Sequence, residues 1–105
     1  PSSAASDVYK RQGFHRSDLR LKHDVALLGR LDNGLGFYRF VYNGGKKAYV
    51  GVMAQEVEQV MPEAVWRAPD GYLRVAYDKV GVTFQSCDSW EAAGAHVPAG
   101  ITTAH

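Results

Sequence analysis

The spacing of apolar residues predicts a helix near the start of the chain. The positions that carry this pattern are Leu21, Val25, Leu28 and Leu31. They recur at intervals of three or four residues, which is typical of an amphipathic helix with one buried face. Asn33-Gly34 follows, and Gly tolerates the left-handed conformation in which many helices end. We therefore expect one helix that is complete before Gly34.

The next segment predicts a β-hairpin. Residues 37–42 are rich in aromatic and β-branched side chains, which favours a strand. One face of this strand would carry Tyr38, Phe40 and Tyr42. Asn43-Gly44-Gly45 is typical of a hairpin turn, so 48–53 is the expected returning strand. The aromatic stripe is typical of a core or a subunit interface rather than a ligand platform.

A second helix and a second hairpin follow. The helix is indicated by the spacing of Met53, Val57, Val60 and Met61. Pro62 cannot continue it, and the simplest expectation for Glu56 and Glu58 is its solvated face. Residues 64–66 and 72–75 flank Ala68-Pro69-Asp70-Gly71, in which Pro suits the second position of a type I turn and Gly the last. The fold class expected is therefore α+β.

The pattern weakens after Tyr77. Val80, Val82 and Phe84 alternate, and Asp88 with Glu91 resembles the capping box of a short helix that ends at Gly94. Residues 95–105 carry Pro98, Gly100 and paired Thr, and we expect them to be a flexible tail. The domain itself is expected to span residues 13–94.

Composition excludes several classes of protein. The chain has 105 residues, 46% of them hydrophobic, and a net charge of +1. The weak charge gives no basis for binding nucleic acid or an anionic membrane, and no apolar run approaches the ~20 residues of a membrane span. The single Cys87 is expected to be a small buried hydrophobe. The cytoplasm is the default compartment.

The first twelve residues call for separate treatment. Ser2 to Gln12 show no hydrophobic period, and they match the translation of a transposase adapter used in sequencing libraries. We expect 1–12 to be such an artefact and exclude it from the fold. Its charged residues sum to +1, so the remainder of the chain is neutral. The native polypeptide is then expected to extend upstream of about Gly13.

Two residues before the first predicted helix combine a nucleophile with a base. Ser17 and Lys22 lie in the stretch Ser-Asp-Leu-Arg-Leu-Lys. A serine becomes nucleophilic when a neutral lysine takes its proton, which requires the lysine pKa to fall from ~10.4. Arg20 is a candidate nearby cation, and Leu19 and Leu21 are candidate desolvating neighbours. From this stretch alone, however, Ser17 and Asp18 are ordinary helix caps and Lys22 a solvated residue.

Three motifs in order resemble the intramolecular chaperone of endosialidase, the S74 peptidase family. They are Ser17 to Lys22, Gly51 to Val65, and Val75 to Lys79, so the resemblance covers roughly residues 16–79. The motif positions in the second and third segments are Gly51, Ala54, Gln55, Glu56, Val57, Pro62, Glu63, Tyr77 and Asp78. Many members continue into a long stem helix, whereas Gly81 and Gly94 make such a helix unexpected here.

The resemblance implies a function and a site. Such domains lie at the C-terminus of phage tail spikes and fibres, where they trimerise, help the upstream passenger to fold and release themselves by one self-cleavage. Carried over by position, Ser17 is the nucleophile, Lys22 the base and Arg16–Ser17 the scissile bond, with Asp18 and Arg20 as supporting residues. The resemblance implies no cofactor and no metal. It implies a bacterial host cytoplasm during tail assembly, with the passenger ending in the virion tail.

The spacing of the dyad restricts its geometry. In a continuous helix, residues five apart lie about 140° apart around the axis. Either Ser17 to Leu21 is therefore irregular, or Lys22 acts from another subunit of the trimer. His15 and His23 flank the site without a metal-ligand pattern, and we expect them to be surface residues.

Two other functions stay open. The first is a non-cleaving trimerisation or attachment domain of a tail protein, which would keep the fold and lack the reaction. The second is a cap of a cytoplasmic transcription factor, since the same module occurs in such proteins.

Overall fold

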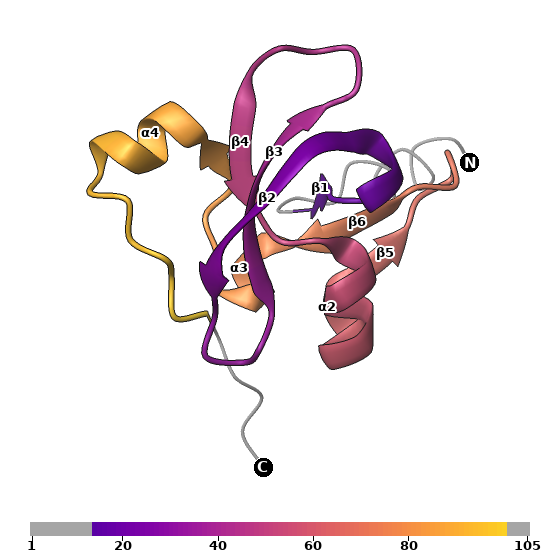
Figure 1. Cartoon of the computed structure of the whole chain (residues 1–105). Coiled ribbons are helices and arrows are strands. Elements are labelled where there is room, and N and C mark those ends of the chain that lie inside the picture. The colour runs from indigo at the N-terminus through magenta and orange to yellow at the C-terminus, as the bar shows by residue number, and fades with distance from the viewer. Residues whose placement is uncertain (1–13, 101–105) are drawn as a thin grey trace.

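Two antiparallel sheets and several short helices make up the fold in the computed structural model, which describes residues 14–100 (Figure 1). The elements are β1 (Phe14–Arg16), η1 (Leu19–Leu21), β2 (Lys22–Arg30), β3 (Gly36–Tyr42), β4 (Ala48–Gly51), α2 (Ala54–Val60), η2 (Pro62–Ala64), β5 (Val65–Arg67), β6 (Leu73–Ala76), α3 (Tyr77–Val80), β7 (Gln85–Ser86) and α4 (Cys87–Ala92). The expected α+β class is confirmed.

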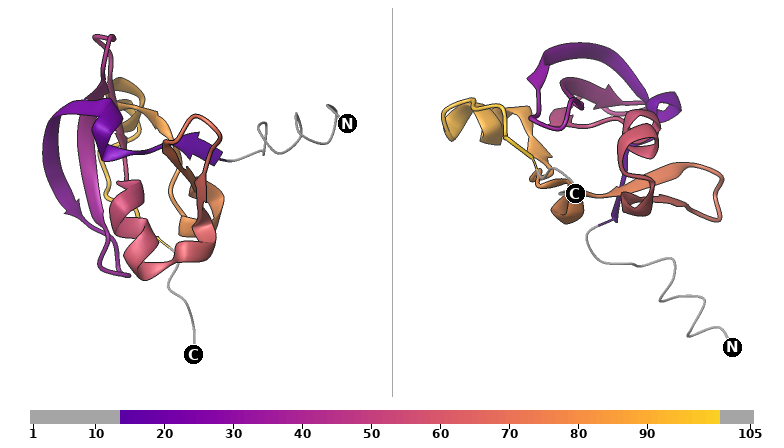
Figure 2. Two further views of the ribbon diagram at one scale, coloured as in Figure 1. Left: turned by 90° about the vertical axis from the view of Figure 1, so that its right-hand side faces the viewer. Right: turned by 90° about the horizontal axis from the view of Figure 1, so that it is seen from below.

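The sheets lie on opposite sides of the core. One has the strand order β2-β3-β4-β7 and the other β1-β6-β5, and Figure 2 shows them facing each other with α2 at one end. Helix α2 packs against β5 and β6, while α4 packs on β4 and β7. Both sheets and α2 contribute to the core, whose largest buried side chains include Leu35, Phe37, Val50, Val57, Val75 and Val80.

The first predicted helix is wrong, because Lys22–Arg30 forms the strand β2. This strand pairs with β3 along its length, and its register shifts twice, between His23 and Ala26 and between Leu27 and Gly29. The shifts remove the period-two alternation by which a strand is recognised. Val25, one of the four residues of the predicted apolar stripe, is 39% exposed, so the helical spacing did not mark one buried face. Tertiary pairing therefore decided the structure here.

The turn chemistry gave correct predictions at both expected hairpins. Gly44 and Gly71 have φ angles of +86°, in the left-handed region where glycine is favoured. The Gly71 N–H donates to the Ala68 carbonyl oxygen at 2.9 Å, which closes the second turn. Helix α2 ends at Val60, ahead of Pro62, as the proline predicts. The returning strand β4 is shorter than expected and stops at Gly51.

Helix α4 near the C-terminus was predicted correctly, but the residue that caps it was not. Ser86, not Asp88, caps α4, since its hydroxyl accepts a hydrogen bond from the Ser89 N–H at 3.1 Å. The single-turn helix α3, which ends at Gly81 in the left-handed conformation, was not predicted. Cys87 is buried, as expected.

Two residues of the expected flexible tail are hydrogen-bonded to the folded domain, one to the loop between β2 and β3 and the other to α4. The Asp32 N–H donates to Ala99 O at 2.8 Å, and the Trp90 indole donates to His96 O at 2.8 Å. Residues 101–105, and the proposed adapter segment 1–12, lie outside the described residues. Between residues 14 and 100 the longest helix, α2, has seven residues, so a stem helix is missing from this part of the chain. No helix there is long and apolar enough to cross a membrane.

Glu56 corrects the expectation of a fully solvated α2 face. One of its carboxylate oxygens accepts a hydrogen bond from the Gly36 N–H at 3.0 Å, and the other accepts one from the Tyr38 hydroxyl. This half-buried carboxylate therefore ties α2 to the start of β3. Glu58, two residues on, is exposed as expected.

We predict that Glu56→Ala destabilises the fold much more than Glu58→Ala. The first change leaves the Gly36 N–H and the Tyr38 hydroxyl without their acceptor, which costs about 1–3 kcal/mol. The second removes an exposed charge from the same helix and should stay within about 0.5 kcal/mol. Urea unfolding of both variants checks this. Equal losses would contradict a structural role for Glu56.

Candidate functional site

Ser17 and Lys22 meet inside one chain. Ser17 follows β1 and is fully buried. The three-residue 3₁₀ turn Leu19–Leu21 then reverses the chain, so that Lys22 begins β2 with its Nζ 3.0 Å from Ser17 Oγ. Of the two arrangements compatible with the sequence spacing, the structure has the irregular segment that joins both residues in one subunit.

The lysine amine lies in a poorly hydrated environment. Lys22 Nζ donates to Val52 O at 3.0 Å, contacts Met53 Sδ at 3.5 Å and lies 3.8 Å from the centre of the Phe40 ring. Burial disfavours the charged form and lowers the pKa of Lys22 to about 7, against the opposing effect of the Asp18 charge. A lysine with this pKa is substantially neutral at physiological pH.

Leu19 and Arg20, two of the three neighbours expected to cause this effect, do not enclose the amine. Leu19 is 46% exposed, and the Arg20 guanidinium pairs with the Asp18 carboxylate at 2.7 Å. The desolvation comes from Phe40 on β3 and from Val52 and Met53 after β4, residues distant in the sequence.

The serine hydroxyl belongs to a closed set of hydrogen bonds with Tyr77 and Val52. The Val52 N–H donates to the Tyr77 hydroxyl oxygen at 3.2 Å. The Ser17 hydroxyl donates to the Val52 carbonyl oxygen, so the Tyr77 hydroxyl, 3.2 Å from Ser17 Oγ, is the donor in that contact. Burial raises the pKa of Tyr77 to about 12, which keeps the phenol protonated and able to donate.

Several motif residues surround this set. At Gly51 a Cβ atom would overlap the Tyr77 hydroxyl, which explains why this position lacks a side chain. The N–H of Ala54, at the start of α2, donates to Ser17 O at 2.8 Å. Val57 and Pro62 shape α2 and its end. Glu63 and Asp78 are exposed, and within residues 14–100 neither side chain is hydrogen-bonded to Ser17 or Lys22.

The peptide bond between Arg16 and Ser17 is held from both sides. Its N–H donates to Leu73 O on β6 at 3.2 Å, and its carbonyl oxygen accepts a hydrogen bond from the Tyr42 hydroxyl at 2.5 Å. A cavity of about 210 Å³ lies beside it, lined by Arg16, Leu21, Tyr42 and Asn43. Tyr42 was expected only as a core or interface residue, and no local signal marked this contact.

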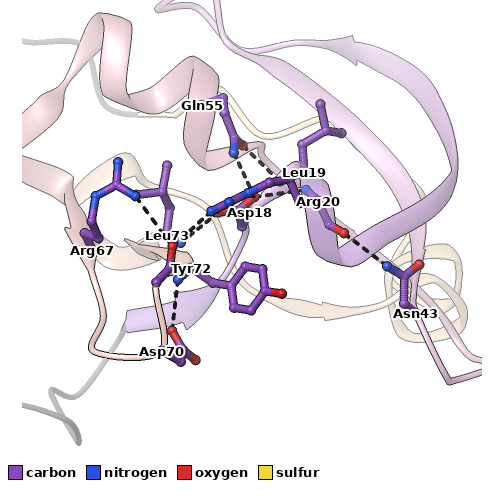
Figure 3. A network of polar contacts seen from close by, with 10 residues as sticks. Asp18, Leu19, Arg20, Asn43, Gln55, Arg67, Asp70, Tyr72 and Leu73 are labelled. Carbon is purple, nitrogen blue, oxygen red and sulfur yellow. Dashed lines mark hydrogen bonds and ion pairs between the residues drawn. The ribbon is translucent and has the colours of Figure 1, made fainter.

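The Asp18 carboxylate connects three elements (Figure 3). It accepts hydrogen bonds from the Arg20 backbone and guanidinium, from Gln55 Nε2 at 2.8 Å and from the Leu73 N–H at 3.0 Å. Gln55 Oε1 in turn accepts from the Leu19 N–H at 2.9 Å. These donors, Arg20 first, hold the pKa of Asp18 well below its usual range. Asp18, rather than Ser17, is the cap of the turn.

Among the described residues, neither His15 nor His23 is hydrogen-bonded to Ser17 or Lys22, although the His15 ring lies edge-on to the Tyr77 ring with centres 5.4 Å apart. His15 stacks on Phe84 with ring centres 4.6 Å apart, and burial lowers its pKa. It is therefore packed against the core rather than free on the surface as expected. His23 is exposed and lies 3.2 Å from Asp24. Within residues 14–100, no three His, Cys, Asp or Glu side chains are grouped as metal ligands.

We predict that Asp18→Ala lowers the free energy of unfolding by about 2–3 kcal/mol at neutral pH, since the buried Leu73 N–H loses its acceptor. Asp88→Ala, at an exposed position in α4, should cost less than about 1 kcal/mol. Because the folded-state pKa of Asp18 is depressed, its contribution is present above about pH 4 and fades as pH falls below that value. The difference between wild type and Asp18→Ala should therefore narrow in acid. A difference independent of pH would contradict the ionised, hydrogen-bonded carboxylate.

Comparison with known proteins finds a family that matches part of the chain. Residues 17–66 match the family model of peptidase S74, the chaperone of endosialidase. No curated protein and no solved structure matches the chain. The matched segment runs from Ser17 to the strand β5 and includes Lys22 and the motif around α2, while the Val75 to Lys79 motif lies beyond it. Members of this family are self-cleaving peptidases and chaperones. Residues 17–66 therefore carry the sequence of the chaperone of endosialidase family, peptidase S74.

Proposed function

We propose that this chain is an intramolecular chaperone domain that cuts itself once at Arg16–Ser17. Ser17 acts as the nucleophile and Lys22 as the general base. The observation that supports this proposal most directly is the 3.0 Å contact between Lys22 Nζ and Ser17 Oγ. The contact is buried, and burial lowers the pKa of Lys22 to about 7. A neutral amine within hydrogen-bond reach is what a serine nucleophile requires.

The proposed reaction begins with attack of Ser17 Oγ on the carbonyl carbon of Arg16. The Ser17 hydroxyl first turns from the Val52 carbonyl oxygen toward Lys22 Nζ. The neutral Lys22 amine then takes the hydroxyl proton as the new C–O bond forms. The C–N bond then breaks, and the lysine ammonium returns the proton to the departing Ser17 amine, which leaves Arg16 esterified to Ser17. Water hydrolyses this ester to give the Arg16 carboxylate and the free Ser17 hydroxyl. The serine and the carbonyl are neighbours in the chain, so no separate binding step is needed.

The biological setting of the proposal is a trimeric tail protein. The upstream passenger would be a phage tail fibre or tail spike, and folding and cleavage would take place in the bacterial host cytoplasm. The exposed apolar side chains of Val25 and Leu27 on β2 support shared burial between three copies. The scissile bond follows the last residue of β1, so cleavage would separate β1 and the polypeptide upstream of it from the rest of the domain.

We predict that Ser17→Ala and Lys22→Met each abolish cleavage. The experiment uses the chain behind an upstream passenger and follows, by mass spectrometry, the product that begins with Ser17. Lys22→Met keeps the apolar contacts of the lysine stem and removes the base, while Lys79→Met, an exposed lysine on α3, should cleave like wild type. Cleavage that survives both dyad variants would overturn the mechanism. Intact chains in a wild-type trimer would instead support the non-cleaving attachment domain.

We also predict a cleavage rate that depends on pH with a midpoint of about 7. Below that value the Lys22 amine is mostly protonated, and the rate should rise about tenfold per pH unit as the neutral fraction grows. Above it the neutral form dominates and the rate should level off. Single-turnover rates between pH 5 and 9 check this. A midpoint near 10 would mean that burial does not perturb the lysine.

A further inference from the structure

We propose that the Tyr42 hydroxyl stabilises the negative charge that forms on the Arg16 carbonyl oxygen during cleavage. This inference rests on the proposed self-cleavage and adds a third catalytic residue to Ser17 and Lys22. It assigns to Tyr42 a function that the aromatic stripe of the sequence does not indicate.

The geometry of the scissile peptide carries the inference. The Tyr42 hydroxyl donates to the Arg16 carbonyl oxygen at 2.5 Å, while the N–H of the same peptide donates to Leu73 O at 3.2 Å. In a trans peptide the C=O and N–H point in opposite directions, so β3 holds the bond from one side and β6 from the other. Attack by Ser17 Oγ turns the carbonyl oxygen into an oxyanion at the end of an existing hydrogen bond.

The phenol is fixed before the reaction. The Tyr42 ring packs against Phe40, Tyr49 and Phe84, with ring centres 5.3, 5.5 and 6.4 Å apart. A donor already aimed at the position of developing charge needs no reorganisation in the transition state, and such preorganisation is a main source of catalysis in acyl transfer.

The phenol also keeps its proton. Burial raises the pKa of Tyr42, the nearby Tyr77 and Tyr49 act in the same direction, and the Arg16 charge opposes them. The group is therefore a neutral donor across the pH range in which Lys22 changes its charge. Lys22 and Tyr42 thus divide the chemistry, because the amine moves the proton of Ser17 and the phenol stabilises the oxygen of Arg16.

The second half of the reaction can use the same donor. Tyr42 and Arg16 both line the cavity of about 210 Å³, which is large enough to admit water. Attack of water on the Arg16 ester generates a second oxyanion on the same oxygen. One phenol next to a water-accessible cavity therefore serves both acyl transfer and hydrolysis.

The test compares Tyr42→Phe with Tyr49→Phe in the chain with its upstream passenger. Both changes remove a hydroxyl from the same aromatic cluster, but only the first removes the donor to Arg16. We expect Tyr42→Phe to slow cleavage by about 100-fold, the effect of losing one oxyanion donor, and to leave the pH midpoint near 7. Tyr49→Phe should cleave like wild type. Thermal unfolding of both variants in a Ser17→Ala background reports on the fold separately.

A second substitution keeps the test independent of folding. Replacing Tyr42 with 3,5-difluorotyrosine preserves the ring and lowers the phenol pKa, so the rate should fall at alkaline pH as the donor ionises, a limb that wild type lacks. Wild-type rates in Tyr42→Phe, or an unchanged profile with difluorotyrosine, would overturn the inference while leaving the Ser17–Lys22 dyad in place. If the wild-type chain stays uncleaved, both the proposed self-cleavage and the role of Tyr42 are overturned. Failure of the Tyr42 role alone is therefore distinguishable from failure of the proposed function.

Discussion

The arrangement of the site depends on the buried Asp18 carboxylate. It accepts hydrogen bonds from the turn that follows it, from Gln55 on α2 and from the Leu73 N–H on β6. Because one anion joins these three elements, it fixes where the chain leaves β1 and where it enters β2. Ser17 stands on one side of that turn and Lys22 on the other, so their 3.0 Å contact follows from the position of Asp18. A charge that is buried and fully hydrogen-bonded is suited to such a role, since any displacement would leave it unpaired.

Burial has opposite consequences for the charges of Asp18 and Lys22, which lie in one short segment. Asp18 retains its charge because five donors reach it, whereas Lys22 faces Phe40, a carbonyl oxygen and a thioether and is shifted toward its neutral form. The Arg20 guanidinium pairs with the Asp18 carboxylate, and within residues 14–100 the Lys22 amine has no anionic partner in hydrogen-bond contact. The segment can thus be stable and contain a neutral base at the same time.

The sequence predicted best those features that depend on local chemistry. The two hairpin turns contain Gly44 and Gly71, and helix α2 ends before Pro62, as expected. These features were predictable because turn geometry and the missing proline N–H act within a few residues. The strand β2 was missed because its register shifts hide the alternation, and its pairing partner lies in another part of the sequence. In the site, the motif singled out Ser17 and Lys22, whose side chains lie 3.0 Å apart. Tyr42 and Glu56 acquire their contacts only through tertiary packing, which no spacing in the sequence reveals.

The groups of the site come from several different elements of the fold, and this links the chemistry of the site to folding. Ser17 follows β1, Lys22 begins β2, Tyr42 ends β3 and Val52 follows β4, while Tyr77 begins α3 after β6. These elements belong to both sheets, so the groups come together only when the two sheets have packed on each other. Before that, the lysine is hydrated with an ordinary pKa and the peptide bond before Ser17 has neither of its two hydrogen-bond partners. Cleavage by these residues would therefore take place only in a folded domain. A chaperone that is released by its own cleavage requires this order of events.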